Sequence, residues 1–166
     1  MFDGVQRFRL RDAMSDEERK QVKALDARLG SPVKIRLGVF HGDQCVGWSW
    51  GFQESALRFY MCNSAILPEH RRQGLYTKLL QAVVERAEQL GFQEIYSRHV
   101  ATNNAVIIPK LKAGFVMTAM EVNDLFGTLV HLTYYPNPLR KKVLDYRVGQ
   151  VQPDDEIKRH VELSLD

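Results

Sequence analysis

The sequence is poor in the features that mark several common classes of protein. It holds two cysteines among 166 residues, Cys45 and Cys62, and they do not form a metal-type pair. No apolar run approaches the roughly 20 residues that a membrane-spanning helix needs. No basic segment followed by an apolar run stands at the start, so we see no signal peptide. These absences argue against a disulfide scaffold, a metal site and a membrane span. They predict a cytoplasmic protein whose cysteines are reduced and buried.

A strong excess of charge of one sign is also lacking. The formal net charge is +3, which does not indicate binding to nucleic acid or to an anionic membrane. Hydrophobic residues make up 45% and charged residues 26%, as in ordinary globular proteins, and no repeat or low-complexity tract is present. We predict one domain over residues 1–136. A more polar extension, residues 137–166, is expected to pack on that domain or on a second subunit of a homodimer, with its charged runs at 140–142 and 154–156 solvated.

Hydrophobic periodicity predicts the order of the elements. Alternating or apolar runs predict strands at about residues 5–10, 33–40, 45–52, 57–67, 94–100, 116–122 and 128–135. Helices are expected from the capping box at residues 15–18, from about Leu75 and from about Asn104. The last two end at Gly91-Phe92 and at Gly114-Phe115, each a glycine stop followed by an apolar contact. This order predicts an α+β protein with a mixed, mostly antiparallel sheet flanked by helices.

The junction at residues 68–76 lacks a residue that helix starts usually have. No Ser, Thr, Asp or Asn stands between Arg71 and Leu75 to cap the helix, and Arg71 and Arg72 place positive charge at the positive end of its dipole. A bound anion such as a diphosphate would satisfy the free N–H groups and pair with the arginines, and Gly74 would let it approach. The alternative is an exposed basic loop capped by water. A Walker-type loop fits worse, because the Gly-Lys-Ser/Thr ending is missing.

This segment resembles the coenzyme A signature of the GNAT N-acetyltransferase superfamily, apolar-x-Pro-x-x-Arg/Gln-x-x-Gly-x-Gly/Ala. The positions that match are Ile66, Pro68, Arg71 and Gly74. Tyr76 replaces the last small residue and could reshape the loop. Asn103 stands eleven residues before Gly114-Phe115, as in the family's second motif, where an asparagine opens the last helix. The resemblance covers about residues 5–135 and implies a GNAT-like acyltransferase fold.

The resemblance implies a cleft between the strand that ends near Leu67 and the strand that ends near Val100, with acetyl-CoA as cosubstrate. The implied cofactor-binding residues are Ala65, Ile66, Leu67, Arg71, Arg72, Gln73, Gly74, Leu75, Tyr76 and Asn103. The first three would hold the pantetheine arm and polarise the thioester, and the loop would bind the diphosphate. The implied reaction is direct attack of a primary amine, on a small molecule or a peptide, with the thiolate as leaving group.

One departure from the family concerns the general acid. The position four before Gly114 is often a tyrosine in the family and is Lys110 here. We expect Lys110 to be dispensable for turnover and, on a helix with Lys112, to point to solvent. The alternatives are that Lys110 steadies the departing thiolate electrostatically or, if burial lowers its pKa, donates a proton. The missing tyrosine leaves two other functions open: an acyl-CoA-binding sensor or regulatory module without turnover, and an interaction domain with a vestigial cleft.

Other candidate residues have no motif to support them. Glu54 and His99 are the candidate general bases, although each could be merely structural. Cys62 is a possible nucleophile but is more typical of a small core residue. The four aromatic residues Trp48, Trp50, Phe52 and Tyr60 could line an acceptor pocket but are assigned mainly to the core, and the first three are expected to share one strand face with Val46.

Overall fold

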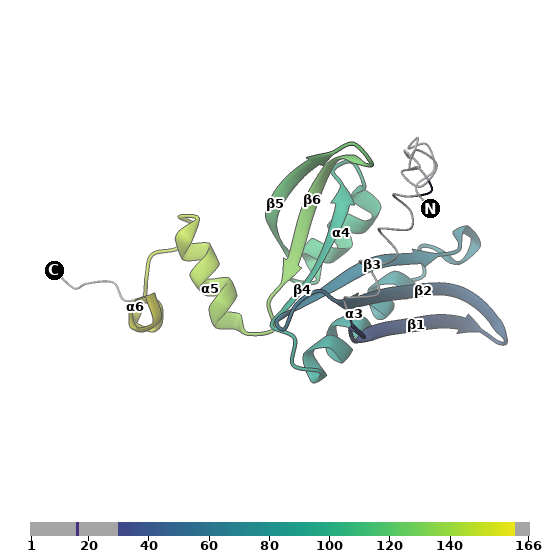
Figure 1. The fold of residues 1–166 in the computed structure, drawn as a ribbon, viewed down its shortest axis with the longest axis horizontal. Helices are drawn as coiled ribbons and strands as arrows, with labels where there is room; N and C mark the ends of the chain where they lie inside the picture. Colours follow the sequence, from purple (N-terminus) through teal and green to yellow (C-terminus); the bar gives the residue numbers. More distant parts are fainter. Residues whose placement is uncertain (1–15, 17–29, 162–166) are drawn as a thin grey trace. The chain divides into compact units, whose positions relative to one another are not determined.

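The computed structural model describes Asp16 and residues 30–161, so the strand predicted at 5–10 and the first helix lie outside the described residues. Within them six strands form one sheet (Figure 1). They are β1 (Lys34–His41), β2 (Gln44–Gln53), β3 (Arg58–Ile66), β4 (Glu94–Val100), β5 (Val116–Asn123) and β6 (Gly127–Tyr134). Their spatial order is β1-β2-β3-β4-β6-β5, and only β3 and β4 pair in parallel. The predicted mixed, mostly antiparallel sheet is confirmed.

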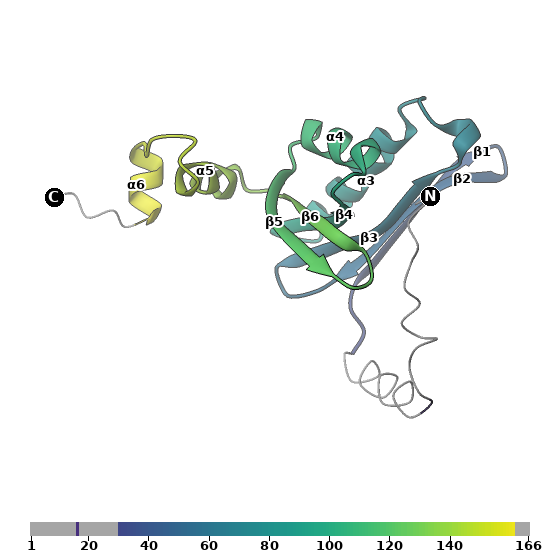
Figure 2. The ribbon, with the colours of Figure 1, turned by 90° about the horizontal axis from the view of Figure 1, so that it is seen from above.

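Two helices cover one face of this sheet (Figure 2). A 3-10 turn η1 (Pro68–His70) leads from β3 toward α3 (Leu75–Gln89), which packs against β1, β2 and β3. The shorter α4 (Asn104–Lys112) packs against β6. Both helices are followed by glycines in the left-handed region, Gly91 at φ 87° and Gly114 at φ 91°, as their sequence stops predict.

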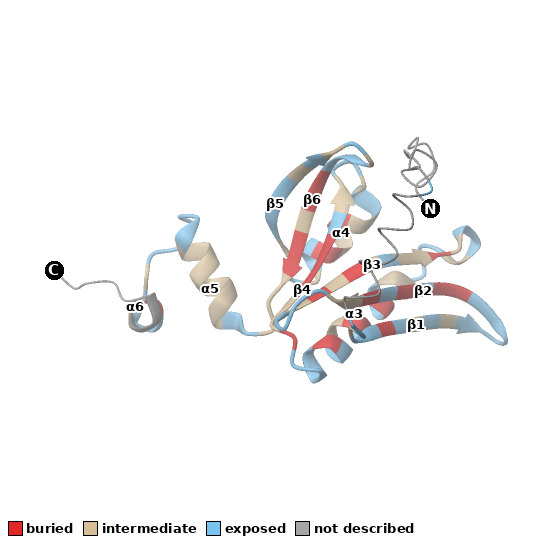
Figure 3. Cartoon of the chain, viewed as in Figure 1, coloured by how far each residue is buried: buried red, intermediate tan, exposed pale blue. Residues whose placement is uncertain are grey.

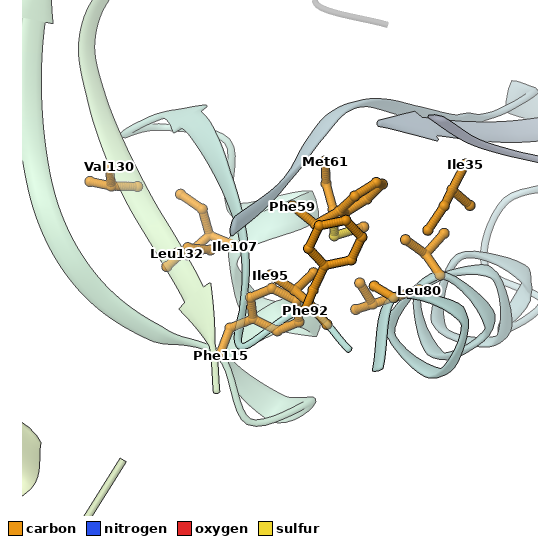
Figure 4. Close-up of a cluster of buried hydrophobic side chains, with 12 residues drawn as sticks. Ile35, Phe59, Met61, Leu80, Phe92, Ile95, Ile107, Phe115, Val130 and Leu132 are labelled. Atoms are coloured by element: carbon orange, nitrogen blue, oxygen red, sulfur yellow. The ribbon is translucent and has the colours of Figure 1, made fainter. Parts of the chain in front are cut away.

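The hydrophobic core lies between the sheet and the helices (Figures 3 and 4). Side chains alternate along a strand, so Phe59 and Met61 of β3 point to the same face, and there they join Ile95 of β4 in the core. Helix α3 adds a buried stripe that includes Leu80, and the Phe59 ring lies 5.4 Å from that of Phe92. This shared core holds α3 against the sheet.

The parallel pairing of β3 and β4 is short. Three residue pairs join the strands, from Arg58 opposite Glu94 to Tyr60 opposite Tyr96, and beyond them the strands run apart (Figure 1). We refer to the point just beyond Tyr60 and Tyr96 as the vertex. A β-bulge at Cys62 falls immediately after it, because this residue has no partner on β2, and a bulge bends its strand. Cys62 is half-buried, not fully buried as predicted.

A second bulge changes the predicted faces of β2. Val46, between Cys45 and Gly47, has no partner on β1 and turns into the core with 1% of its surface exposed. Trp48 and Trp50 remain exposed on the other face. The prediction that these residues share one face is therefore wrong, as is the assignment of the two tryptophans to the core. Cys45 is exposed, which contradicts its predicted burial.

Residues 135–166 form a second compact unit, of which the described part holds α5 (Pro138–Arg147) and α6 (Asp155–Val161). The side chain of Asn137 caps α5 by accepting from the backbone N–H of Leu139 at 2.9 Å. Lys142 pairs with Asp154 and, at 2.7 Å, with Glu156. Lys142 thus joins the two charged runs that were expected to be solvated. No described helix of the chain has the length and apolar character required to cross a membrane.

Gly51 of β2 lies next to the bulge, opposite Met61, and is predicted to be costly to replace. A Cβ at Gly51 would lie 2.3 Å from the carbonyl oxygen of Tyr60 and 2.7 Å from the Phe59 ring, so backbone would have to move. We expect Gly51→Ala to lower the free energy of unfolding by about 1–3 kcal/mol. The matched control is Gly38→Ala, whose Cβ would meet only the exposed ring of Phe40. Equal denaturant midpoints for the two variants would contradict this reading.

Candidate functional site

A cavity of about 570 Å³ opens between β3 and β4 beyond the vertex and extends to the start of α3. Of the residues implied by the resemblance or proposed as bases, those that line it are Ala65, Ile66, Arg71, Arg72, Gly74, Leu75, Tyr76, His99 and Asn103. Leu67, Gln73 and Glu54 are not among the lining residues. The structure therefore brings His99 to the same cavity as the helix junction but keeps Glu54 away from it.

The start of α3 has the geometry of an anion site. No side chain caps it, and its first turn holds no acidic residue, so its first N–H groups and positive dipole end lack a protein anion. Gly74 adopts φ 74° and Arg72 adopts φ 61°, the left-handed region that a non-glycine residue enters at a cost of about 1–2 kcal/mol. The Nε of Arg71 donates to the carbonyl of Ile66 at 2.9 Å and ties the loop to β3. A Cβ at Gly74 would meet no atom within 4 Å, so the space above it is open.

Two polar side chains in the cavity wall lack the hydrogen bonds that such residues usually make within a protein. Tyr76 packs its ring against the core, and its buried hydroxyl has no hydrogen-bond partner in the described part of the chain. Burial raises the pKa of this hydroxyl, so it stays protonated. Asn103 is the N-cap residue of α4, yet its side chain makes no capping bond. Both groups remain available to a ligand, and the Tyr76 ring lies in the core instead of filling the loop.

Lys110 does not point to solvent, which contradicts our expectation from the sequence. It is 1% exposed, and its Nζ lies at the vertex. There it donates to Ser97 Oγ at 2.6 Å and lies 3.4 Å from Met61 Sδ, and these are the first residues of β4 and β3 beyond their last pair. The Phe115 ring centroid is 4.7 Å away. Lys110 lines the cavity, so an amine that can carry a positive charge stands where the two strands separate.

Burial is the main cause of the pKa shifts of Lys110 and His99. It lowers the pKa of Lys110 from 10.5 to about 7, and burial together with the Lys110 charge lowers the pKa of His99 to about 3. Neutral His99 lies 2.9 Å from Ser97 through Nε2. Because a charged Lys110 can only donate to Ser97 Oγ, the Ser97 hydroxyl is left to donate to His99 Nε2. Lys110, Ser97 and His99 thus form one directed chain of hydrogen bonds, in which His99 is a weak base.

Glu54 belongs to the opposite face of the sheet. Its carboxylate accepts from the Tyr96 hydroxyl and pairs with Arg58 at 3.2 Å. Tyr60 and Tyr96 alternate with core residues along their strands and therefore point away from the helices. Their rings, 5.0 Å apart, continue a row of aromatic contacts from β2 to β6. Glu54 is thus engaged in this row and not in the cavity.

Our reading of the sequence missed the roles of Ser97 and Met61 and misplaced Lys110. One signal was available for Lys110: it stands three residues after buried Ile107, and residues three apart share a helix face. Nothing comparable marked Met61 or Ser97, because their importance comes from standing just beyond the last β3–β4 pair.

The mixed, mostly antiparallel sheet flanked by helices matches the fold of GNAT acetyltransferases. The chain belongs to the GNAT acetyltransferase family, whose model matches residues 3–115. None of the curated proteins matches the sequence.

Solved structures show the same fold at low identity. A GNAT family acetyltransferase from Elizabethkingia anophelis with acetyl-CoA bound is 15% identical, with a TM-score of 0.59 over 68% of this chain and 82% of that one. The ribosomal-protein-S18-alanine N-acetyltransferase from Escherichia coli is 19% identical, with 0.57 over 68% and 75%. A Bacillus subtilis acetyltransferase in complex with CoA is 14% identical, with 0.57 over 75% and 95%.

The lowered pKa of Lys110 predicts a particular pH dependence of stability. Between pH 7 and 10.5 the unfolded chain binds a proton at Lys110 that the folded chain has released, so this residue makes stability rise with pH across that window. We expect the free energy of unfolding of the wild type to rise relative to that of Lys110→Met from pH 7 to pH 10. Lys112→Met, exposed on the same helix, is the control and should run parallel to the wild type. Parallel curves for Lys110→Met would show that the lysine titrates normally.

Proposed function

We propose that this protein is an N-acetyltransferase that moves the acetyl group of acetyl-CoA to a primary amine by direct attack. The observation that carries the proposal is the uncapped start of α3, with left-handed Arg72 and Gly74, opening on the cavity between β3 and β4. Acetyl-CoA or CoA is bound in the related structures from Elizabethkingia anophelis, Salmonella typhimurium and Bacillus subtilis.

The residues present fit acetyl-CoA. The free N–H groups of α3, with Arg71 and Arg72 beside them, suit a diphosphate. The unpartnered Tyr76 hydroxyl and the Asn103 amide suit the polar groups of a pantetheine arm. Beyond the vertex, the β3 backbone has no β4 partner, so its polar groups can meet the arm instead.

The bound cosubstrate supplies an activated acetyl thioester, and the chain supplies position and polarity. A backbone N–H of β3 near Ala65 would stabilise negative charge on the thioester oxygen, a contribution of about 3 kcal/mol in comparable sites. A side chain with a pKa of about 3 is a poor proton acceptor at neutral pH, so His99 would not act as the general base. It would instead orient groups in the cavity. The amine would therefore enter in its neutral form and give its proton to water.

We propose an amine on a small molecule or a peptide as the acceptor; among the neighbours, one is named as an enzyme that acetylates the alanine of ribosomal protein S18. The two unbonded cysteines support the cytoplasm as its compartment. A second function, an acyl-CoA-binding module without turnover, is favoured by one observation: no Asp or Glu stands among the described residues that line the cavity.

An acceptor screen with acetyl-CoA and thiol detection decides between these functions. We expect thiol release that depends on both protein and amine. Calorimetric binding of acetyl-CoA without release for any amine would identify the non-catalytic module. Absence of both binding and release would reject the proposal.

Gly74 offers a sharper test of the binding loop. We expect Gly74→Val to weaken acetyl-CoA binding by more than about tenfold, because valine disfavours φ 74° and fills the open space above the loop. Gly91→Val, at the other end of α3, is the matched control, because Gly91 also has positive φ and open space but does not line the cavity. Calorimetry should show near-normal affinity for the control. Equal loss in both variants would mean that only helix stability is measured.

A further inference from the structure

Lys110 is a buried amine whose protonated form has no anionic partner among the described residues that line the cavity. Its Nζ contacts a hydroxyl, a thioether and an aromatic ring, all uncharged. No carboxylate lines the cavity in the described part of the chain. A buried charge that lacks a partner costs several kcal/mol in general, and such groups persist where an anion or a reaction compensates them.

The position of Lys110 Nζ indicates which anionic group could lie beside it. Lys110 shares the cavity with the start of α3, but its Nζ contacts Met61 and Ser97 at the vertex, whereas Gly74 lies at the helix junction. The phosphates of acetyl-CoA are already matched by that junction. During acetyl transfer two atoms of the thioester gain negative charge. One is the carbonyl oxygen, which the β3 backbone near Ala65 would stabilise, and the other is the sulfur, which has no partner assigned so far.

We propose that Lys110 binds the coenzyme A sulfur in its thiolate form at the vertex between β3 and β4, an inference that rests on the proposed function. As the amine nitrogen bonds to the carbonyl carbon, the C–S bond breaks and its electron pair goes to sulfur. The sulfur stays a thiolate paired with the Lys110 ammonium. The amine nitrogen loses one proton to water, and the thiolate takes one proton from water when coenzyme A leaves. The sum is amine plus acetyl-CoA giving amide plus CoA.

Ser97 and His99 are positioning residues in this scheme. Ser97 accepts from Lys110 at 2.6 Å and can donate to His99 Nε2 at 2.9 Å, so the chain of hydrogen bonds holds Nζ toward the vertex. An alkyl thiol has a pKa of about 8.5, and a neighbouring lysine cation lowers it. A thiolate beside Lys110 therefore stabilises the ammonium, and the ammonium stabilises the thiolate.

Other groups of the cavity bear on any pH dependence. The titratable or charged side chains that line it besides Lys110 are Cys62 on β3, His70, Arg71 and Arg72 before α3, Tyr76 on α3, and Arg98 and His99 on β4. The cationic groups among them favour the thiolate as well, so the test must isolate the contribution of Lys110.

The test compares CoA with desulfo-CoA, which lacks the sulfur, by calorimetry at neutral pH. We expect the wild type to bind CoA at least about tenfold more tightly than desulfo-CoA. Lys110→Met should lose this preference while keeping its affinity for desulfo-CoA. Lys112→Met, exposed on the same helix, should keep the preference. An ultraviolet difference spectrum of wild-type protein with CoA should show the thiolate band, and this needs no variant to fold.

The outcomes separate the inference from the proposed function. Equal affinities of the wild type for the two ligands, a preference that survives Lys110→Met, or a bound thiol without the thiolate band would overturn the role of Lys110 and leave acetyl-CoA binding intact. If the wild type binds neither ligand, the proposed function fails and this inference fails with it.

Discussion

The parallel contact between β3 and β4 ends after three residue pairs, and the rest of the site depends on that limit. Continued pairing would join the backbone groups of the two strands and close the cavity. The bulge at Cys62, two residues after the last pair, bends β3, while β4 stays paired with β6. Because α3 follows β3 after a short turn, its uncapped start lies at the opening of the cavity.

The cavity combines two features that a folded protein normally avoids. One is a helix start without a capping side chain, and the other is a buried lysine without a carboxylate partner. Each alone disfavours folding, and each is relieved by negative charge. Both features require negative charge, and they lie in one cavity. A single ligand with two anionic regions could therefore satisfy both.

Local rules predicted much of this fold. The glycines at 91 and 114 are left-handed as their sequence positions indicate, and Gly74 marked the helix junction correctly. The bulges at Val46 and Cys62 were not predictable, because a bulge depends on pairing with another strand. Lys110 was misjudged because charge was weighed above helical spacing. Such errors fall where tertiary contacts override local preference.

The short β3–β4 contact also has a mechanical consequence. It makes the sheet two antiparallel halves, β1–β3 and β4–β6, held by a narrow joint and by the core beneath it. A joint of three residue pairs resists bending less than a continuous sheet does. The angle between the two halves should therefore vary more easily than it would in a continuous sheet. A ligand that contacts both halves would restrict this motion.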